Sequence, residues 1–430
     1  MKMELSISKK ITIFFLLGAL ISYIFQSVLD NFGFEVAPFF FTGLAFIASF
    51  FIHSEKATNI WLLDIFVIIG LISIIFSFFF IESYQPSVGL IAFLAVYINL
   101  ITWLLFLRKL NKGELETTLE LFTRVLIALG CILSISGIFQ TFVDRSILGF
   151  ASNDLYSDEE AMSSGNFVPR ATGLMGSAQN YGFLVGVVFA ISLVFPIKRT
   201  IIRIGIIVLL LSGIVVSGSR SSSMCFIVAV VLLFALWVNK VKVNRALLAV
   251  GFLLIAILIC CSCFIGNIDI LNDRTFSRLS NFDMSNTFAI YKEVVNSLTL
   301  DKVLVGNGLG SNVWTVYQLL GSDGYFQVYG ESYSSVESYI LSLLVQCGVS
   351  APVVFCCLYF RALFQAIRVN RIWLMFLLCL AVNIVFTPSF SGMAISFIGW
   401  PFILAPLIRK ELSDKHKRVT AVLPEENERI

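Results

Sequence analysis

Charge is scarce in this chain of 430 residues. Aspartate, glutamate, lysine and arginine together make up 13% of the sequence, whereas soluble domains carry roughly a quarter charged residues. This shortage excludes an ordinary soluble domain. The net charge is only +3, so the composition gives no reason to expect a nucleic-acid partner.

Histidine is also nearly absent. The two histidines, His53 and His416, both fall in segments that we predict to be cytoplasmic. The nine cysteines are scattered, and only Cys260, Cys261 and Cys263 form a cluster. A zinc site would require spaced thiols or histidines as further ligands. We therefore expect no metal and no cofactor, and we expect the cysteines to pack as apolar residues.

Hydrophobic residues dominate instead, at 58% of the chain, with a mean hydropathy of +0.91. Many apolar stretches reach the roughly 17–25 residues that cross a bilayer as a helix, which satisfies its own backbone polar groups. We predict an all-α polytopic integral membrane protein of about 12 transmembrane helices, forming a single membrane domain over residues 1–430. The predicted spans are residues 11–29, 37–53, 60–81, 88–107, 119–142, 179–196, 201–217, 222–238, 246–266, 337–359, 372–388 and 394–408.

The basic residues predict the orientation. With the N-terminus inside, most of the 30 lysines and arginines fall in cytoplasmic segments, as the positive-inside rule requires. Both termini are then cytoplasmic. The exceptions on the outer side are Arg145, Arg170, Arg220, Arg274, Arg278, Lys292 and Lys302. Outer arginines in a histidine-poor membrane protein indicate a site for an anionic substrate, such as a lipid-linked phosphate.

Two charged residues lie within predicted spans, near their cytoplasmic ends. Charges at membrane depth are costly and are usually paired. Asp64 and Arg124 are therefore expected either to pair with each other or to extend to the inner surface.

Two predicted outer loops are long, at residues 143–177 and 267–336, and the second separates the ninth and tenth spans. Loops of this length are usually functional or disordered. Residues 119–360 are therefore predicted to be the functional core. Within the second loop, residues 288–298 carry an apolar stripe with helical spacing, which predicts an amphipathic helix.

The first outer loop and the turn before the eighth span carry candidate anion-binding residues. Arg170 precedes a span, Gly173 would permit close backbone approach, and Asn180 lies at the helix start, where free N–H groups favour an anion. Arg220 lies in the small, hydroxylic turn SGSRSSS, and its planar guanidinium suits a phosphate. For each arginine the structural alternative is contact with lipid headgroups or solvent.

The second outer loop carries the remaining candidates. Arg274 and Arg278 lie four residues apart and would share a helical face; we favour Arg278, although nearby aspartates could neutralise both. Gly306 and Gly308 predict a tight turn in VLVGNGLGSN. Glu337, at the outer mouth of a predicted span, is a candidate general base, with an ion pair to an arginine as the alternative.

Four segments in this order resemble the Wzy-type O-antigen polymerase and O-antigen ligase superfamily: PRATGLMGSAQNYG, SGSRSSS, VLVGNGLGSN and VESYILSLLVQCGV. The resemblance covers roughly residues 170–349, and the earlier spans add topology only. It implies a metal-independent glycosyltransferase of the bacterial inner membrane that acts on the outer face. Its substrate would be an oligosaccharide repeat unit carried on undecaprenyl pyrophosphate.

The resemblance also implies roles for individual residues. Arg170, Arg220 and a third arginine would hold the pyrophosphate, with Arg220 and Glu337 taking part in catalysis. A membrane lipid environment and a chain-length regulator are the implied partners. The third arginine stays open between Arg274 and Arg278, because the family's arginine at the start of the amphipathic helix is replaced by polar and aromatic residues here. Ligases carry a histidine where this chain has Glu337, which favours a polymerase.

Three other functions remain as alternatives. An O-antigen ligase shares the motifs. A transporter shares the topology of twelve spans with both termini inside, although the short connection at residues 196–200 and the long outer loops argue against it. A flippase for the same lipid-linked unit is the third.

Overall fold

The computed structural model describes residues 5–53, 60–80, 86–143, 171–241, 298–309, 338–386 and 393–422, and these are helical without a strand. The predicted all-α class is thereby confirmed. The helices are α1 (Ile7–Ile24), α2 (Gln26–Asn31), α3 (Ala37–Phe50), α4 (Trp61–Phe80), α5 (Pro86–Leu107), α6 (Lys112–Phe142), the 3-10 turn η3 (Gly173–Met175), α8 (Ala178–Val194), α9 (Thr200–Ser217), α10 (Arg220–Val241), α14 (Leu300–Val305), α16 (Tyr339–Cys347), α17 (Ser350–Val369), α18 (Arg371–Phe386) and α19 (Met393–Val422).

Short polar signals set where several helices begin and end. The Asn111 side chain accepts a hydrogen bond from the Glu114 amide, and the Glu114 carboxylate accepts one from the Asn111 amide, both at 2.9 Å. This capping box satisfies two of the free amides at the start of α6. The hydroxyls of Ser177 and Ser338 cap α8 and α16 in the same manner. Gly218 ends α9 with a φ of +53°, which glycine adopts without steric cost.

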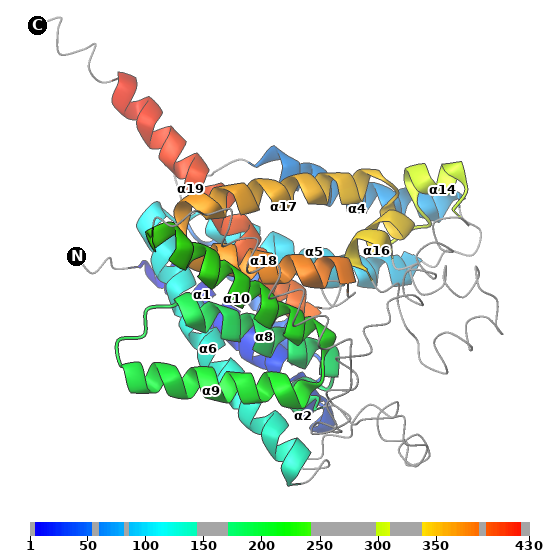
Figure 1. The fold of residues 1–430 in the computed structure, drawn as a ribbon. Coiled ribbons are helices and arrows are strands. Elements are labelled where there is room, and N and C mark those ends of the chain that lie inside the picture. The colour runs from blue at the N-terminus through cyan, green and yellow to red at the C-terminus, as the bar shows by residue number, and fades with distance from the viewer. Residues whose placement is uncertain are drawn as a thin grey trace, which may run out of the picture.

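Two helices form the centre of the bundle. Nearly every residue of α8 is buried, and α8 packs against α6, α9, α10 and α18 (Figure 1). Residues 394–408 of α19 are likewise buried, between α1, α5 and α17. Both are apolar around their whole circumference, as expected of helices surrounded by others. Beyond residue 408 α19 continues out of the bundle to Val422, so the predicted span 394–408 corresponds to its buried half.

Small residues let the helices around α8 approach closely. A Cβ on Gly182 would lie 2.4 Å from the Ser219 Cβ, and a Cβ on Gly186 would lie 3.0 Å from the Ser222 Cα. In a bilayer, helices associate through such packing and through interhelical hydrogen bonds, because lipid is as apolar as the side chains. The close contact of α8 with α10 follows from these two glycines.

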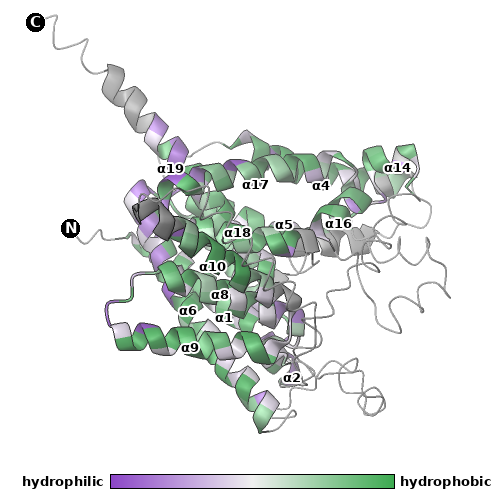
Figure 2. Ribbon diagram, in the orientation of Figure 1, coloured by the Kyte–Doolittle hydropathy of each residue, from purple (hydrophilic) through white to green (hydrophobic). Residues whose placement is uncertain are grey.

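The described residues contain four helices long and apolar enough to cross a membrane, namely α1, α6, α9 and α17. Shorter apolar helices of 10–17 residues lie in α3, α4, α5, α8, α10 and α18. Most residues along these helices are hydrophobic (Figure 2). A membrane protein is thus supported, but the count of about 12 spans is not confirmed. The predicted ninth span, residues 246–266, lies outside the described residues.

One predicted span is wrong as a continuous helix. Residues 337–359 were expected to form a single span, but α16 ends at Cys347 and α17 begins at Ser350. Gly348 separates them with a φ of +69°, a conformation that breaks a right-handed helix. The apolar sequence on both sides concealed this break.

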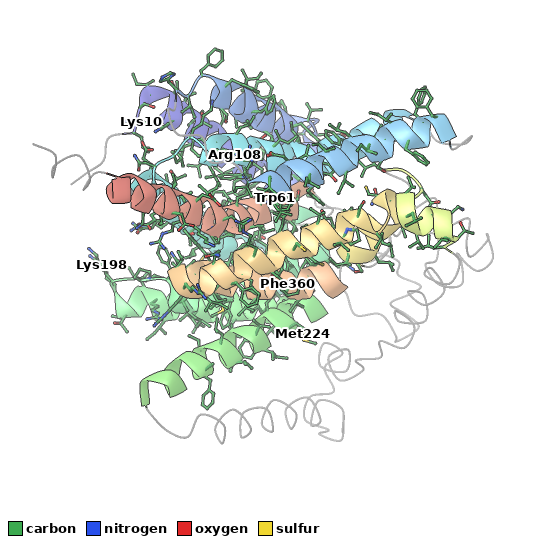
Figure 3. The ribbon with its side chains drawn as sticks, turned by 90° about the horizontal axis from the view of Figure 1, so that it is seen from above. Lys10, Trp61, Arg108, Lys198, Met224 and Phe360 are labelled. Carbon is green, nitrogen blue, oxygen red and sulfur yellow. The ribbon has the colours of Figure 1, made fainter. Side chains whose placement is uncertain are left out.

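The two ends of the bundle differ in chemistry. α1 starts and α19 leaves the bundle at one end, which also holds Lys10 and Lys198 (Figures 1 and 3). We call it the basic end, because its lysines and arginines join the helices there through ion pairs. The pairs are Lys9 with Glu114, Arg108 with Asp64, Arg361 with Glu411, and Arg409 with Glu116. We call the opposite end, with α2, η3, the α9–α10 turn, α14 and α16, the glycine end. It holds the positive-φ glycines of the described residues: Gly33, Gly173, Gly176, Gly218, Gly306, Gly308 and Gly348.

The ion pairs correct one sequence-based expectation. Asp64 bonds Arg108 across α4 and α5, at 3.0 Å between Oδ1 and Nη2. Arg124 instead pairs with Glu120, one turn earlier in α6, at 2.5 Å. The first of the two alternatives, a pairing of Asp64 with Arg124, is therefore wrong. Arg124 pairs with a residue one turn away on its own helix, and Asp64 pairs with Arg108, which directly follows α5. Each side chain therefore has a nearby partner.

Candidate functional site

The predicted site residues divide into two groups. Arg170, Arg274, Arg278 and Glu337 lie outside the described residues. Arg220 is the first residue of α10, and only its backbone position is described. The predicted supporting residues Gly173, Asn180, Gly306 and Gly308 are all described, and all belong to the glycine end. The segments that flank Arg170 and Arg220 therefore define the geometry of the candidate site.

The segment that follows Arg170 is held by one side chain of α6. Gln140 Oε1 accepts hydrogen bonds from the amides of Thr172 and Gly173, each at 2.9 Å. Gln140 Nε2 donates to Thr172 Oγ1 at 3.0 Å. Both side-chain ends of a buried glutamine are thus bonded to two consecutive residues. Residues 171–175 are themselves buried, so this segment is fixed from its first described residue.

The same segment is tied to the end of α9. The amide of Ala171 donates to the carbonyl oxygen of Val216 at 3.3 Å. Val216 lies in the last turn of α9, and α10 begins four residues later at Arg220. The residue directly after Arg170 is therefore hydrogen-bonded to the turn that carries Arg220, which links two segments far apart in the sequence.

The α9–α10 turn is organised by its serine hydroxyls. Ser217 Oγ lies 2.6 Å from the carbonyl oxygen of Ile214 and 2.9 Å from Ser222 Oγ. Ser222 Oγ donates to the Ser219 carbonyl oxygen at 2.7 Å. Ser217, Ser219 and Ser222 are buried, with exposed fractions of 0–3%. Three of the five serines of SGSRSSS are therefore buried, and they hold the start of α10.

Gly173 has a packing role that the sequence did not reveal. A Cβ at Gly173 would lie 2.6 Å from the ring of Tyr181, and one at Gly137 would lie 2.1 Å from the Tyr181 hydroxyl. That hydroxyl is 3.4 Å from the Gly213 carbonyl oxygen. The close approach predicted at Gly173 is thus made by an aromatic ring of α8. Asn180 is half-buried, and its backbone N–H donates to Ser177 Oγ at 3.4 Å. Contact of Gly173 or Asn180 with a substrate stays a prediction.

Gly306 and Gly308 lie where two chain segments cross. The amides of Asn307 and Gly308 donate to the carbonyl oxygens of Val345 and Gln346 at 2.8 and 3.0 Å, and the Val349 amide donates to Val303 at 2.8 Å. Ser73 of α4 adds a bond from its hydroxyl to the Gln346 carbonyl oxygen at 3.0 Å. The last carbonyls of α16 are thereby satisfied, although the helix stops inside the protein.

The glycines are required at this crossing by space as well as by backbone conformation. A Cβ on Gly306 would lie 2.3 Å from the Gln346 carbonyl oxygen, and one on Gly348 would lie 2.2 Å from the Leu304 carbonyl oxygen. Neither contact could be relieved by turning a side chain, because both partners are backbone atoms. Gly306 ends α14, and the irregular backbone at Gly306 and Gly308 lies against the break before α17.

Two carboxylates, Asp30 and Glu35, lie between α1 and α3, and Asp30 belongs to α2. The helix α2 packs against η3, and Ser27 lies against Gly176. Partial burial, with a further contribution from Glu35, raises the pKa of Asp30. Raising the pKa means that the charged carboxylate is disfavoured there. Neither carboxylate was a candidate from the sequence.

Gln140 was also missed. A glutamine near the end of an apolar run indicates only a helix boundary, and its partners lie about thirty positions later, beyond any local pattern. Among the described residues, no three His, Cys, Asp or Glu side chains gather closely enough to hold a metal ion.

Comparison with protein-family models gives no match, and comparison with curated protein sequences gives none either. The family resemblance therefore rests on the four motifs themselves. The described parts of these motifs meet in space as two pairs: the first with the second, through Gly182 and Ser219, and the third with the fourth, through Asn307 and Val345.

Proposed function

We propose that the chain is a membrane glycosyltransferase that polymerises oligosaccharide repeat units linked to undecaprenyl pyrophosphate, on the outer face of the bacterial inner membrane. One observation supports this most directly. The hydrogen bond from Ala171 to Val216 brings together the segments that carry Arg170 and Arg220. Two arginines from these segments would suit a pyrophosphate, because a guanidinium binds phosphate oxygens bidentately.

The reaction follows from the charges involved. A hydroxyl of the acceptor's terminal sugar attacks the anomeric carbon of the donor glycan through an oxocarbenium-like transition state. The new glycosidic C–O bond forms as the bond to the pyrophosphate breaks, and the pyrophosphate leaves with the bonding electron pair. Arg170, Arg220 and Arg278 would stabilise this developing negative charge. Glu337 would take the proton of the attacking hydroxyl.

The orientation of α16 supports a role for its N-terminal neighbour. Ser338 caps α16 directly after Glu337, and α16 is fixed at its other end by α14 and by Ser73. A carboxylate carried on the start of a helix anchored in this way would have a defined position, which general-base catalysis requires.

A transporter or flippase of the lipid-linked unit is the second candidate, and the interruption at Gly348 favours it. Broken helices mark the substrate sites of many transporters. In those sites, however, the freed backbone groups face a substrate or an ion. Here the carbonyls of Val345 and Gln346 are already bonded to Asn307 and Gly308, so the interruption is closed within the protein.

Deletion of the gene in its host, followed by complementation and gel analysis of the surface glycan, tests the proposal. We expect the deletion to abolish the long-chain ladder and leave a single repeat unit on the core. Arg220→Ala should fail to restore the ladder. Arg124→Gln is the matched control, because Arg124 pairs with Glu120 toward the basic end, and it should restore the ladder fully.

Each other outcome has a distinct meaning. Loss of all glycan from the core would indicate a ligase or a flippase. An unchanged ladder in the deletion strain would contradict any role in glycan assembly and favour a different transporter. Membrane insertion of each variant is checked by immunoblot of the membrane fraction, so that a missing ladder is not mistaken for a missing protein.

A further inference from the structure

Gln140 is a buried side chain that holds the segment between Arg170 and α8 by both of its polar ends. Its exposed fraction is 6%. Its Oε1 accepts from two consecutive backbone amides, Thr172 and Gly173, and its Nε2 donates to the Thr172 hydroxyl. Other helix-borne polar groups described nearby, such as Ser134 and Thr141, bond only to their own helix. Gln140 thus reaches outward from α6 to an irregular segment.

The irregular segment depends on this contact because its own backbone offers few alternatives. η3 is a single 3-10 turn, entered through Gly173 and left through Gly176, both with positive φ. Such a turn satisfies few amides internally. Gln140 supplies the acceptor for Thr172 and Gly173, where burial would leave an unbonded amide strongly disfavoured.

The contact continues to the second arginine segment. Ala171, directly before the two residues that Gln140 holds, donates its amide to Val216 in the last turn of α9. From Val216 the chain enters the turn fixed by Ser217 and Ser222 and reaches Arg220. Hydrogen bonds at consecutive residues 171–173 therefore connect α6 with the last turn of α9, directly before the α9–α10 turn.

We propose that Gln140 is a positioning residue for the pyrophosphate of the lipid-linked substrate. It does not touch the substrate. It fixes the segment that emerges from Arg170 at a set spacing from the turn that carries Arg220, so that both arginines meet one pyrophosphate. This inference rests on the proposed function and adds the residue that determines how its two anion-binding segments are aligned.

Three variants separate positioning from stability. Gln140→Leu keeps the size of the side chain but removes every hydrogen bond from Gln140 to Thr172 and Gly173. Thr172→Val removes only the hydroxyl and leaves Gln140 Oε1 bonded to the two amides. Asn99→Leu is the matched control, because Asn99 is a buried amide on α5 that bonds Ser396 and Tyr23, outside the candidate site.

The first measurement is amide hydrogen exchange of a peptide covering residues 171–175, in the purified full chain. Gln140→Leu should accelerate exchange at Thr172 and Gly173, whereas Asn99→Leu should not. The second is the affinity for undecaprenyl pyrophosphate. Gln140→Leu should weaken it by about 10- to 100-fold, the range seen when an orienting partner is lost or a binding group moves by about 1 Å. Thr172→Val should weaken it by no more than about 3-fold.

Steady-state kinetics with the lipid-linked repeat unit should show the loss mainly in KM for the donor. The proposal is overturned if Gln140→Leu exchanges faster but binds undecaprenyl pyrophosphate as tightly as the unaltered chain. It is also overturned if Gln140→Leu and Asn99→Leu weaken binding equally, which would indicate a stability effect.

The same measurements distinguish failure of the proposed glycosyltransferase function from failure of the positioning role of Gln140. If the unaltered chain forms no polymer but binds undecaprenyl pyrophosphate, and Gln140→Leu weakens that binding, the glycosyltransferase proposal fails while the positioning role holds. If the unaltered chain does not bind undecaprenyl pyrophosphate at all, both are overturned.

Discussion

The basic end and the glycine end solve the same problem with different chemistry. Where helices meet at the basic end, charged side chains join them in pairs such as Lys9 with Glu114 and Arg409 with Glu116. At the glycine end, helices and turns are joined by backbone amides, serine hydroxyls and glycines in left-handed conformation. Every ion pair found in the described part of the chain lies at the basic end or in the half of α6 next to it.

This difference indicates which end of the bundle has arginines that are not needed to join helices. At the basic end, arginines and lysines form ion pairs that join the helices of the bundle. At the glycine end the scaffold is built without them, which would leave Arg170 and Arg220 to act on a ligand. The division predicts that the two ends respond to opposite kinds of substitution.

The largest effect should come from breaking the glycine end at the α14–α16 crossing. Gly348→Ala places a Cβ 2.2 Å from the Leu304 carbonyl oxygen at a φ of +69°. We expect a loss of about 4 kcal/mol or more in unfolding free energy, as for the most disruptive single substitutions. The measurement is unfolding in mixed detergent micelles.

Gly33→Ala is the control for backbone strain in that experiment. Gly33 has a φ of +77° but would place its Cβ in open space. Its substitution should cost only the strain of a left-handed residue, about 1–2 kcal/mol. Equal losses for the two variants would mean that the crossing itself contributes nothing.

A smaller but still large effect is expected from breaking the charge pairing at the basic end. The side chains of Lys9 and Glu114 are only 14% and 8% exposed, so Lys9→Met leaves a buried carboxylate without its cation. We expect a loss of about 3 kcal/mol. A double-mutant cycle with Glu114→Gln, measured in the same micelles, isolates the pair.

The exposed pair of Arg124 and Glu120, at 63% and 49%, sharpens this test. Arg124→Gln should change stability by less than about 0.5 kcal/mol. A loss from Arg124→Gln as large as that from Lys9→Met would show that burial does not decide the strength of these pairs.

A moderate effect is expected within the serine turn at the glycine end. Ser222→Ala removes a buried hydroxyl bonded to Ser219 and Ser217 and should cost about 1 kcal/mol. Ser212→Ala is the comparison, because its exposed hydroxyl bonds only the Val208 carbonyl of its own helix. Thermal unfolding in detergent would show no difference between the two if the hydroxyl cluster were irrelevant.

The sequence predicted the helices far better than their junctions. Length and apolarity locate α3, α9 and α18 to within a few residues, because these features are local. The break at Gly348 could not be predicted from the same pattern. Its cause is the backbone of Leu304, more than forty positions earlier, which only the folded structure brings near.

The candidate site divides in the same way. The spacing of Gly306 and Gly308 gave a local signal of irregular backbone, and both residues have a positive φ. Gln140 gave no local signal, since its partners Thr172 and Gly173 lie on another segment. The roles of Arg170, Arg220, Arg278 and Glu337 stay predictions.

The crossing of α14 and α16 has a consequence for biogenesis. α14 leaves the ribosome before α16, yet the carbonyls of Val345 and Gln346 obtain their partners from the residues that follow α14. Until α14 is in place, the Val345 carbonyl lacks its bond from Asn307 and the Gln346 carbonyl has only its bond from Ser73, and hydrocarbon tolerates unbonded carbonyls poorly. The six-residue helix α14 must therefore stay near the membrane while residues 310–337 are synthesised. The bundle is completed only when α14 packs against α16.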